Sequence, residues 1–506
     1  MNISEFLLIS SAIVPDRNAI IFENERITFE HLQNEVNNLA KNLIDIGVTP
    51  DNRVAVMDVN CSQLTQIFFA TMQIDAIYVP VNFRARAEEL KQMLNASTPQ
   101  ILFIGSRYLK LLNDIDLGSD LRIIVTDSSE FKGLLSGDGE QTIFPEHDSE
   151  DTSVIMFTAG TTGTPKGVLL SHDSFVSYML SNVTPADPDD SETNLLTVPL
   201  YHIAGLQALV AGIYGGRTIV LMKQFDPVEW MTLVSEYSID RAMLVPTMIK
   251  QLMDSPHFIE SDLTSLKVIT YGAAPMPVNI ITRALVQFPN AQFINAFGQT
   301  ETASTITMLS PEDHILNGTA KENSEKLKRL TSIGKPLEDV EVMIVDEFGV
   351  PVQTGITGEI VARGDRMMKG YWQQEDATAA TIVDGWVYTG DLAYQDESGY
   401  IFLAGRSRDF IKRGGEMISP EEIEQLLVTH PDIEEAAVVG KANEEWGEVV
   451  HAFIVGGPNC TLTKQDVLEH CRESLASFKL PEWVTFTSTL PRNSLGKILK
   501  TELRQL

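Results

Sequence analysis

The residues best suited to chemistry lie together at positions 158–167, TAGTTGTPKG. The glycines allow backbone N–H groups to approach a ligand closely, the threonines add hydroxyl donors, and Lys166 adds a positive charge. A strand-like apolar run at residues 153–157 precedes the segment, and this context suits phosphate binding. The alternative is an ordinary glycine-rich surface turn, since turns are commonly built from Gly, Thr and Pro. The phosphate contacts that the segment predicts are Thr158, Gly160, Thr161, Thr162, Gly163, Thr164 and Lys166.

The same ten residues resemble the signature of the adenylate-forming superfamily, which includes acyl-CoA synthetases, luciferases and peptide-synthetase adenylation domains, and whose usual form is TSGTTGTPKG. This chain has Ala159 where Ser is usual, so one phosphate-facing hydroxyl is missing while the backbone donors remain. Four further matches follow in the right order and extend the resemblance over most of the 506 residues. The resemblance implies ATP and coenzyme A as substrates and Mg²⁺ as cofactor.

A second match is NAFGQTE, residues 295–301, which resembles the superfamily's NxYGxTE motif. The resemblance implies that Asn295 belongs to the ATP site and that Phe297 stacks on adenine. It also implies that Thr300 meets the α-phosphate and that Glu301 ligates Mg²⁺. A hard cation there makes chemical sense, because an unpaired carboxylate would repel ATP. Taken alone, a Thr-Glu pair is more typical of a helix start.

Two further segments resemble parts of a nucleotide site. The strand LKVITYG opens into Gly272, Ala273 and Ala274, whose small side chains leave room for a flat ring and resemble the superfamily's adenine wall. Asp391, in YTGD, resembles a ribose-binding aspartate, and a carboxylate is able to accept two ribose hydroxyls. Arg406 resembles an arginine that contacts the ribose and phosphate region. The alternatives are a strand-to-helix turn for the first segment and solvated surface for the two charged residues.

The segment PLYHIAGL, with His202 and Gly205, follows a strand and resembles the region that lines the acyl pocket. A lone His is equally compatible with a structural role. Relatives that activate amino acids carry an Asp here, and this segment offers none, which argues against an amino acid substrate. Acetate-activating relatives carry a Trp where this chain has Gly298, so the resemblance predicts a pocket open to longer or bulkier acyl groups.

The C-terminal stretch PRNSLGKILK resembles the superfamily's PRxxxGKxxK and identifies Lys497 as the catalytic lysine. A carboxylate that attacks the α-phosphate brings two anions together, and a cation at that point lowers the barrier. The resemblance also places a hinge at Arg408, a pantetheine tunnel beside Gly414 and Gly415, and a contact to coenzyme A phosphates at Lys479. Without the resemblance, Lys497 would indicate an ordinary lysine of a C-terminal helix, and Gly414 with Gly415 would indicate a turn.

The elements that must position these residues follow an α/β pattern. Strand-like and helix-like runs alternate over residues 19–127 and 195–301, which predicts parallel sheets with helices on both faces. Residues 309–331 are polar and rich in Lys and Glu, and we expect a mobile surface excursion there. A β-rich part follows. We predict an ATP- and acyl-binding domain of parallel-sheet α/β layers with a β-rich subdomain over residues 1–407, and a small mobile α+β lid over residues 408–506.

Composition narrows the function classes. Hydrophobic residues make up 43% and charged residues 21%, as in a globular chain with large cores, and the net charge of −31 argues against binding nucleic acid. The three cysteines fit neither a metal site nor a disulfide framework, and we expect a reducing cytoplasm. No basic residue precedes the first apolar run, and no stretch approaches the ~20 apolar residues of a membrane span, so we expect neither a signal peptide nor a transmembrane segment.

The sequence predicts an AMP-forming carboxylic acid:CoA ligase that activates an apolar monocarboxylate, either a medium-to-long-chain fatty acid or an aromatic or alicyclic acid. One alternative is an enzyme that loads a carrier-protein pantetheine. Another, of a different class, is a noncatalytic sensor of AMP or acyl-AMP, against which Glu301 and Lys497 argue. The expected partners are a small carboxylic acid, ATP and coenzyme A, and a homodimer stays open together with the exact acid.

Overall fold

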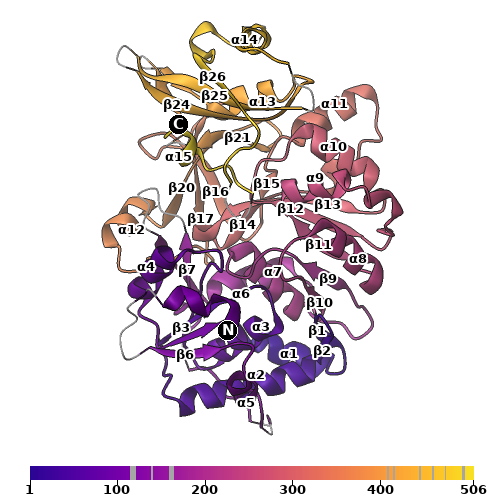
Figure 1. Ribbon diagram of the computed structural model, residues 1–506, viewed down its shortest axis with the longest axis vertical. Coiled ribbons are helices and arrows are strands. Elements are labelled where there is room, and N and C mark those ends of the chain that lie inside the picture. The colour runs from indigo at the N-terminus through magenta and orange to yellow at the C-terminus, as the bar shows by residue number, and fades with distance from the viewer. Residues whose placement is uncertain are drawn as a thin grey trace.

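The computed structural model describes residues 1–506 except for 114, 116–120, 138, 140, 147, 159–164, 407–408, 414–415, 444–445, 458–460, 473 and 493–495, and it leaves out the side chains of residues 406, 416 and 417. The described strands form four sheets (Figure 1). Two large, mainly parallel sheets with helices confirm the α/β prediction for the N-terminal part. A third, antiparallel sheet confirms the β-rich part, and a smaller α+β unit completes the chain.

The first large sheet carries the predicted phosphate segment. Its five strands from β7 to β6 are parallel, while β8 and β18 add two antiparallel strands at one edge. In sheet order the strands are β18 (Gly370–Tyr371), β8 (Lys166–Ser171), β7 (Thr152–Thr158), β4 (Ile77–Pro80), β3 (Arg53–Met57), β5 (Ile101–Ile104) and β6 (Arg122–Val125). The connections and flanking helices include α4 (Ala87–Ser97), η1 (Ser106–Leu112) and α5 (Ser129–Leu134).

The second large sheet carries the predicted adenine wall and the NAFGQTE motif. Its central strands, from β13 to β1, are parallel, and its edges are antiparallel. In sheet order they are β15 (Lys335–Pro336), β14 (Ser304–Leu309), β13 (Gln292–Gln299), β12 (Val268–Gly272), β11 (Arg241–Leu244), β9 (Thr193–Leu196), β10 (Thr218–Leu221), β1 (Asn18–Phe22) and β2 (Glu25–Thr28). The second core packs this sheet against α8 (Pro227–Tyr237), α9 (Pro246–Asp254) and α10 (Val278–Gln287).

The largest hydrophobic core joins the two large sheets. It contains side chains from helices together with strand residues of both sheets, and Phe6, Leu39, Phe68, Phe175 and Leu209 in it are fully buried. Burial of this much apolar surface is the main favourable term in folding. The helices are α1 (Ser4–Ile13), α2 (Phe29–Asp45), α3 (Ser62–Gln73), α5, α6 (Asp173–Asn182) and α7 (Ile203–Tyr214).

The third and fourth sheets follow in the chain. The third consists of β16 (Glu341–Val345), β17 (Gly358–Arg363), β20 (Trp386–Gln395), β19 (Ile382–Val383) and β21 (Ile401–Arg406), with α12 (Glu375–Thr381) before β19. The fourth consists of β23 (Glu416–Ile418), β22 (Ile411–Arg413), β25 (Gly447–Gly456), β24 (Ile433–Asn443) and β26 (Trp483–Thr487). Helices α13 (Pro420–Leu427) and α14 (Lys464–Arg472) share a separate core with the fourth sheet, η5 (Ser477–Lys479) precedes β26, and α15 (Lys500–Leu503) ends the chain (Figure 1).

The polar segment at residues 309–331 contains η4 (Pro311–His314) and the regular helix α11 (Ala320–Arg329). No residue of α11 is buried, which agrees with the expected surface position, while the expected mobility stays a prediction. Thr319 caps α11, because its hydroxyl accepts from the Glu322 N–H while the Glu322 carboxylate accepts from the Thr319 N–H at 2.7 Å. This reciprocal pair stabilises the helix start, and its Thr-x-x-Glu spacing is readable in the sequence.

Two further expectations concern the domain boundary and membrane-spanning helices. The predicted boundary between residues 407 and 408 falls on residues outside the description and stays a prediction. Within the described residues, none of the helices has the length and apolar character that crossing a bilayer requires.

Candidate active site

The predicted phosphate segment closes the hairpin between β7 and β8. Thr158 and Lys166 are register partners on the two strands, so the segment connects the adjacent ends of β7 and β8. Both residues are half-buried. The remaining predicted phosphate contacts, Gly160, Thr161, Thr162, Gly163 and Thr164, lie outside the described residues. The structure therefore places the two ends of the predicted cradle.

The short strand β18, which follows β17 in the chain, lies beside this hairpin. β18 pairs with β8, so that Tyr371 lies opposite Val168. The Trp372 N–H donates to the Gly167 carbonyl at 2.7 Å. This register brings the Lys166 ammonium to 4.6 Å from the centre of the Tyr371 ring. A cation over an aromatic face at this distance is attracted by the ring.

Glu301 approaches the hairpin from the second sheet. It lies in η3 (Thr300–Thr302), directly after β13, where Gln299 and Thr302 cap each other's backbone. The Tyr371 hydroxyl donates to Oε1 of Glu301 at 3.0 Å. Glu301, Lys166 and Tyr371 therefore form one contiguous group, although they come from three separate parts of the chain. The sequence reasoning identified Glu301 and Lys166 but missed Tyr371, because a two-residue strand leaves no periodic signal.

The predicted adenine wall lies where β12 meets β13. Gly272 is opposite Ala296, and a Cβ at Gly272 would lie 2.2 Å from the Ala296 carbonyl oxygen, so only glycine fits this close approach. Ala273 then has a φ of +65°, a strained value for an alanine, and it is exposed. Ala274 is half-buried. An exposed, strained backbone at the carboxyl end of a parallel strand suits ligand contact.

The two other predicted adenine-side residues lie on β13 and make protein contacts. The Asn295 amide donates to the Ser332 carbonyl at 3.2 Å, which ties β13 to the chain after α11. Phe297 is half-buried and packs against the core of the third sheet. Their roles toward adenine stay predictions.

Asp391 and Arg406 are register partners on β20 and β21, so the structure brings the two predicted ribose residues to one place in the third sheet. Asp391 is buried, with 6% of its surface exposed, while the Arg406 side chain is not described. Glu359 lies next to this pair, and its carboxylate accepts from the Gly390 N–H at 2.8 Å. Burial raises the pKa of Glu359, and the charge of Asp391 adds to the rise. Sequence reasoning did not identify Glu359.

His202 and Gly205 form the start of α7, next to the turn at residues 198–200. A Cβ at Gly205 would lie 2.3 Å from the Pro199 carbonyl oxygen, so the glycine lets the helix press against this turn. Asn60 holds the same turn: its amide donates to the Val198 and Met222 carbonyls at 3.2 Å and accepts from the Leu200 N–H at 2.9 Å. Asn60 therefore fixes the turn that precedes His202, and no feature of the sequence pointed to this role.

The His202 ring packs against Tyr201, with ring centres 4.2 Å apart. Burial, followed by the positive charge of Arg84, lowers the pKa of His202 to about 3. The imidazole is therefore neutral near pH 7, which suits the wall of a pocket for an apolar group.

This shift predicts an acid-sensitive contribution to stability. The folded pKa of about 3 lies below the ordinary value of 6.5, so the unfolded chain binds the extra proton between these pH values and stability falls as the pH drops below about 6.5. At pH 5 the loss from His202 is about 2 kcal/mol. Thermal unfolding midpoints at pH 7.5 and pH 5 should therefore drop further for the wild type than for His202→Gln. An equal drop in both proteins would contradict the shift.

Gly298 lies at a bulge between β13 and β14. A Cβ there would be 1.6 Å from the Ser304 carbonyl oxygen, which belongs to the backbone. The bulge therefore supplies its own reason for glycine, independent of any acyl pocket, and a large side chain would displace β14 before it reached a pocket. The predicted role of Gly298 in opening the pocket stays a prediction.

The bulge gives a prediction of its own. Gly298→Ala should destabilise the protein by about 2–4 kcal/mol, because the Ser304 carbonyl has to move to admit the methyl group. Gly133→Ala is the matched control: Gly133 lies in α5 and its Cβ would meet nothing within 4 Å, so this change should be neutral or stabilising. Thermal unfolding of both variants measures the difference. Equal midpoints would show that β14 adapts freely.

The segment of Lys497 packs against the large domain. Gly496 has a φ of +75°, and a Cβ there would lie 2.6 Å from the Thr247 hydroxyl in the first turn of α9. Arg492 donates to the Gly496 carbonyl at 2.5 Å and also forms an ion pair with Glu435 at 2.6 Å. The C-terminal part thus presents the lysine segment to the N-terminal part, as Figure 1 shows for the yellow end of the chain.

The predicted coenzyme A and hinge residues are only partly described. Gly414, Gly415 and Arg408 lie outside the described residues. The Lys479 ammonium contacts both carboxylate oxygens of Glu422, at 2.8 and 2.7 Å. A phosphate at Lys479 would have to share this ammonium with Glu422. Its role toward coenzyme A stays a prediction.

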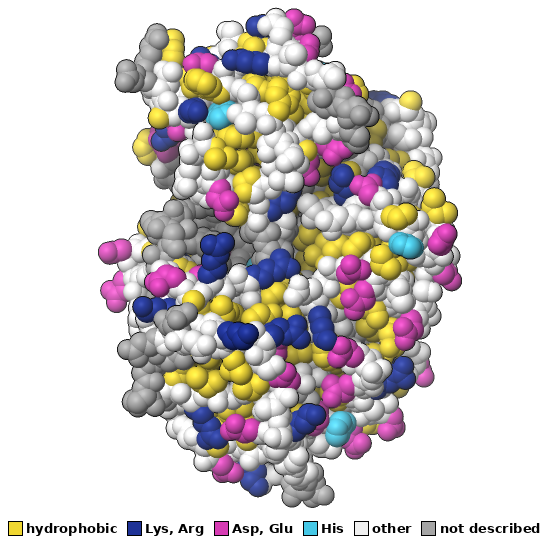
Figure 2. Space-filling model, viewed as in Figure 1, with side chains coloured by type: hydrophobic (Ala, Val, Ile, Leu, Met, Phe, Trp, Pro, Cys, Tyr) yellow, Lys and Arg dark blue, Asp and Glu magenta, His cyan; other side chains and the backbone are white. Residues whose placement is uncertain are grey.

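The charge distribution suits an anionic ligand in spite of the net charge of −31. Figure 2 shows Lys and Arg side chains gathered across the middle of the viewed face, below the notch that separates the C-terminal part from the rest. Among the described residues, no group of three or more His, Cys, Asp and Glu could hold a metal ion by itself. The role of Glu301 toward Mg²⁺ stays a prediction, in which the cation would take its other oxygen ligands from phosphate and water.

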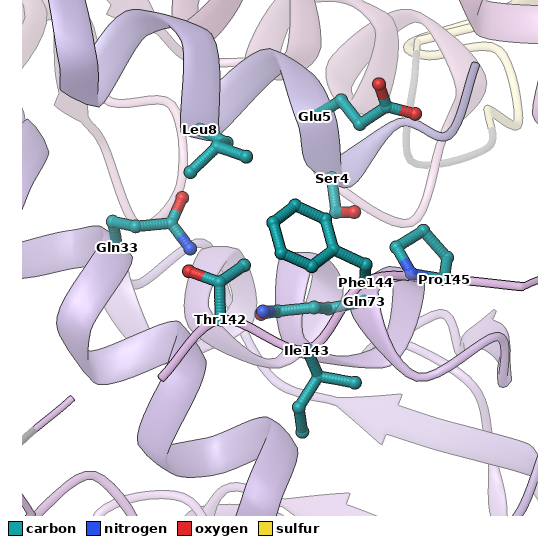
Figure 3. Close-up of a pocket in the computed structure, with 9 residues that line it drawn as sticks. All are labelled: Ser4, Glu5, Leu8, Gln33, Gln73, Thr142, Ile143, Phe144 and Pro145. Atoms are coloured by element: carbon teal, nitrogen blue, oxygen red, sulfur yellow. The ribbon is translucent and has the colours of Figure 1, made fainter. Parts of the chain in front are cut away.

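A small cavity of about 10 Å³ lies far along the chain from these residues, between α1, α2 and residues 142–145 (Figure 3). It has room for about one water molecule. Gln33 and Gln73 line it, and in the described part of the chain neither side-chain carbonyl oxygen has a hydrogen-bond partner. Its size excludes it as a substrate pocket.

Known proteins resemble the chain over nearly its whole length. The family descriptions "AMP-binding enzyme" and "AMP-binding enzyme C-terminal domain" match residues 10–372 and 422–497. The fatty acid–[acyl-carrier-protein] ligase ScoC of Streptomyces coeruleorubidus is 32% identical over 497 residues, which cover 97% of this chain and 93% of that protein. The indoleacetate–CoA ligase of Aromatoleum aromaticum is 31% identical over 514 residues, covering 100% and 98%. The o-succinylbenzoate CoA synthetase MenE of Bacillus subtilis, solved with its acyl-adenylate intermediate, superposes with a TM-score of 0.83 at 27% identity, covering 99% and 97%.

Proposed function

Because this chain belongs to the AMP-binding enzyme family, we propose that it is an AMP-forming ligase that activates an apolar monocarboxylate as an acyl-adenylate and transfers the acyl group to coenzyme A. The observation that carries the proposal is the group of Lys166, Tyr371 and Glu301 at the end of the phosphate hairpin. It supplies a cation for the phosphates and a carboxylate for the metal at one place.

In the first step, a carboxylate oxygen of the acid bonds to the α-phosphorus of ATP while the bond to pyrophosphate breaks. Lys497 neutralises the charge that builds on the α-phosphate oxygens, and Lys166 binds the departing phosphates. Glu301 would hold the Mg²⁺, which when bound neutralises phosphate charge. Asp391 and Arg406 would orient the ribose, and the backbone from Gly272 to Ala274 would receive the adenine.

In the second step, the thiol of coenzyme A gives up its proton to solvent and its sulfur bonds to the acyl carbonyl carbon, while the bond from that carbon to the phosphate oxygen breaks and AMP leaves. We propose that residues 408–506 turn about Arg408 between the two steps. The reason is that this part of the chain has to present Lys497 to the acyl group in the first step and the tunnel for the thiol in the second. The hinge requires only a few loop residues that absorb backbone change.

An apolar acyl group is the substrate class that the residues favour. The start of α7 has no carboxylate to pair with an ammonium group, and His202 is neutral near pH 7. Indoleacetate is the substrate named for one similar protein and a fatty acid for another, and both are apolar monocarboxylates.

The second candidate function is loading of a carrier-protein pantetheine. It is favoured by the similarity to ScoC, whose name gives an acyl carrier protein as the acceptor. Both functions share the first step and differ only in the molecule that brings the thiol.

Pyrophosphate release from ATP and Mg²⁺ tests both functions. The acids should range from acetate to palmitate and include benzoate, cyclohexanecarboxylate and indoleacetate, each without a thiol, with coenzyme A, and with a pantetheine-bearing carrier protein. Sustained turnover that requires coenzyme A and one apolar group of acids would support the ligase. Turnover only with the carrier would favour the second function, and silence with every acid would contradict both.

A further inference from the structure

One short segment, residues 368–372, ties the two halves of the candidate site together. On one side it is hydrogen-bonded to β8, through the Lys369 N–H to the Leu169 carbonyl at 2.9 Å and through the pairing of β18. On the other side the Met368 N–H donates to the Glu301 carbonyl at 2.9 Å. The distance between the phosphate hairpin and Glu301 is therefore fixed by this segment.

Tyr371 contacts both of the oppositely charged residues. Its ring lies under the Lys166 ammonium at 4.6 Å, and its hydroxyl donates to Oε1 of Glu301 at 3.0 Å. The side chain is buried, with 8% of its surface exposed. Both charged residues are described, and no ion pair joins Lys166 to Glu301. Each has its own contact on Tyr371 instead: the ammonium on the ring face, which attracts a cation, and the carboxylate on the hydroxyl.

The backbone of Tyr371 is held in place. The Tyr371 N–H donates to the Thr378 hydroxyl at 2.9 Å, which anchors β18 to α12. The side chain is thereby held at Glu301, to which its hydroxyl donates at 3.0 Å.

We infer that Tyr371 is a positioning residue for Mg²⁺-ATP: it occupies one oxygen of Glu301, leaves the other oxygen for the cation, and prevents Glu301 from pairing with Lys166. The inference rests on the proposed function, because it requires ATP to bind at this site together with Mg²⁺. It assigns two separable tasks to one side chain, with the hydroxyl orienting Glu301 and the ring keeping Lys166 available to phosphate.

Tyr371→Phe removes the hydroxyl and keeps the ring, so it tests the first task. ATP binding is measured by calorimetry in the absence of acid and coenzyme A, once with Mg²⁺ and once with EDTA. We expect the Kd with Mg²⁺ to rise about tenfold, the size expected for one hydrogen bond to a charged group, while the Kd in EDTA stays unchanged. Equal weakening in both conditions, or no weakening in either, would overturn the role of the hydroxyl.

Tyr371→Leu removes the ring as well and tests the second task. With the spacer gone, Glu301 and Lys166 are expected to pair, so ATP binding should weaken in EDTA by about tenfold as well as with Mg²⁺. An unchanged affinity in EDTA would show that Lys166 needs no spacer.

Tyr400→Phe is the matched control, because the Tyr400 hydroxyl also donates to a carboxylate, Asp313 Oδ1, at 2.7 Å. Its ATP affinity should equal that of the wild type in both conditions, while its thermal unfolding midpoint should drop about as much as that of Tyr371→Phe. A Mg²⁺-specific loss in Tyr400→Phe would refute the assignment to Tyr371. Since the readout is binding, a wild type that binds Mg²⁺-ATP but forms no acyl-CoA would overturn the proposed function and leave the role of Tyr371 standing.

Discussion

Lys497→Ala should lower acid-dependent pyrophosphate release on the order of 10³-fold, while conversion of a supplied acyl-adenylate to acyl-CoA stays near the wild-type rate. The first step brings a carboxylate anion against a phosphate anion, and one cation there stabilises the transition state strongly. The second step starts from the finished adenylate, in which that charge has already been redistributed. The contact of Gly496 with Thr247 places the lysine segment against the N-terminal part of the chain.

The two steps are measured separately, by pyrophosphate release and by thioester formation from synthetic acyl-adenylate. Lys464→Ala is the control, because Lys464 is an exposed lysine of the same C-terminal part that donates to the Glu482 carbonyl, and both steps should stay unchanged. Loss of both steps in Lys497→Ala would refute a role confined to adenylation. Retention of both would refute the catalytic assignment altogether.

Glu301→Gln should lower pyrophosphate release about 10²-fold at subsaturating Mg²⁺, with part of the activity restored as Mg²⁺ is raised. The amide keeps the shape of the side chain and a carbonyl oxygen that is able to accept from Tyr371, but it lacks the charge that a hard cation prefers. The change therefore isolates the charge of Glu301 from its packing.

Activity is measured over a range of Mg²⁺ at fixed ATP and acid. The control is Glu325→Gln in α11, where the carboxylate is exposed and lies in a helix of the surface. It should show the Mg²⁺ dependence of the wild type. A Glu301→Gln enzyme with normal half-saturating Mg²⁺ would mean that the metal is held elsewhere.

Parts of the site follow from residue type and local spacing alone. Glycine and threonine before Lys166 indicate a phosphate-binding loop, because backbone freedom and hydroxyl donors are set by a few consecutive residues. The role predicted for Lys497 comes instead from the resemblance of PRNSLGKILK to the superfamily's motif. Strand and helix alternation likewise predicted the parallel sheets, since hydrophobic periodicity records which face of an element is buried. The same local rules would have found α11 from Thr319 and Glu322, had the capping pair been weighed against the polar composition.

The rest was decided by tertiary structure. Tyr371 and Glu301 are 70 residues apart, and they meet only because β18 pairs with β8 at one edge of the first sheet. Lys479 and Glu422 are 57 residues apart and form an ion pair, although the sequence predicted that Lys479 contacts coenzyme A. For Gly298 the sequence predicts an open pocket, and the structure adds a separate reason for glycine, the Ser304 carbonyl across a bulge.

The sequence alone therefore determined which chemical groups the chain has and in which loops and element ends they lie, because those depend on propensity and spacing over a few residues. Only the tertiary structure decided which of these groups share a site. Strand order and register join positions that are distant in the chain, and burial of the common core between the two large sheets fixes that order.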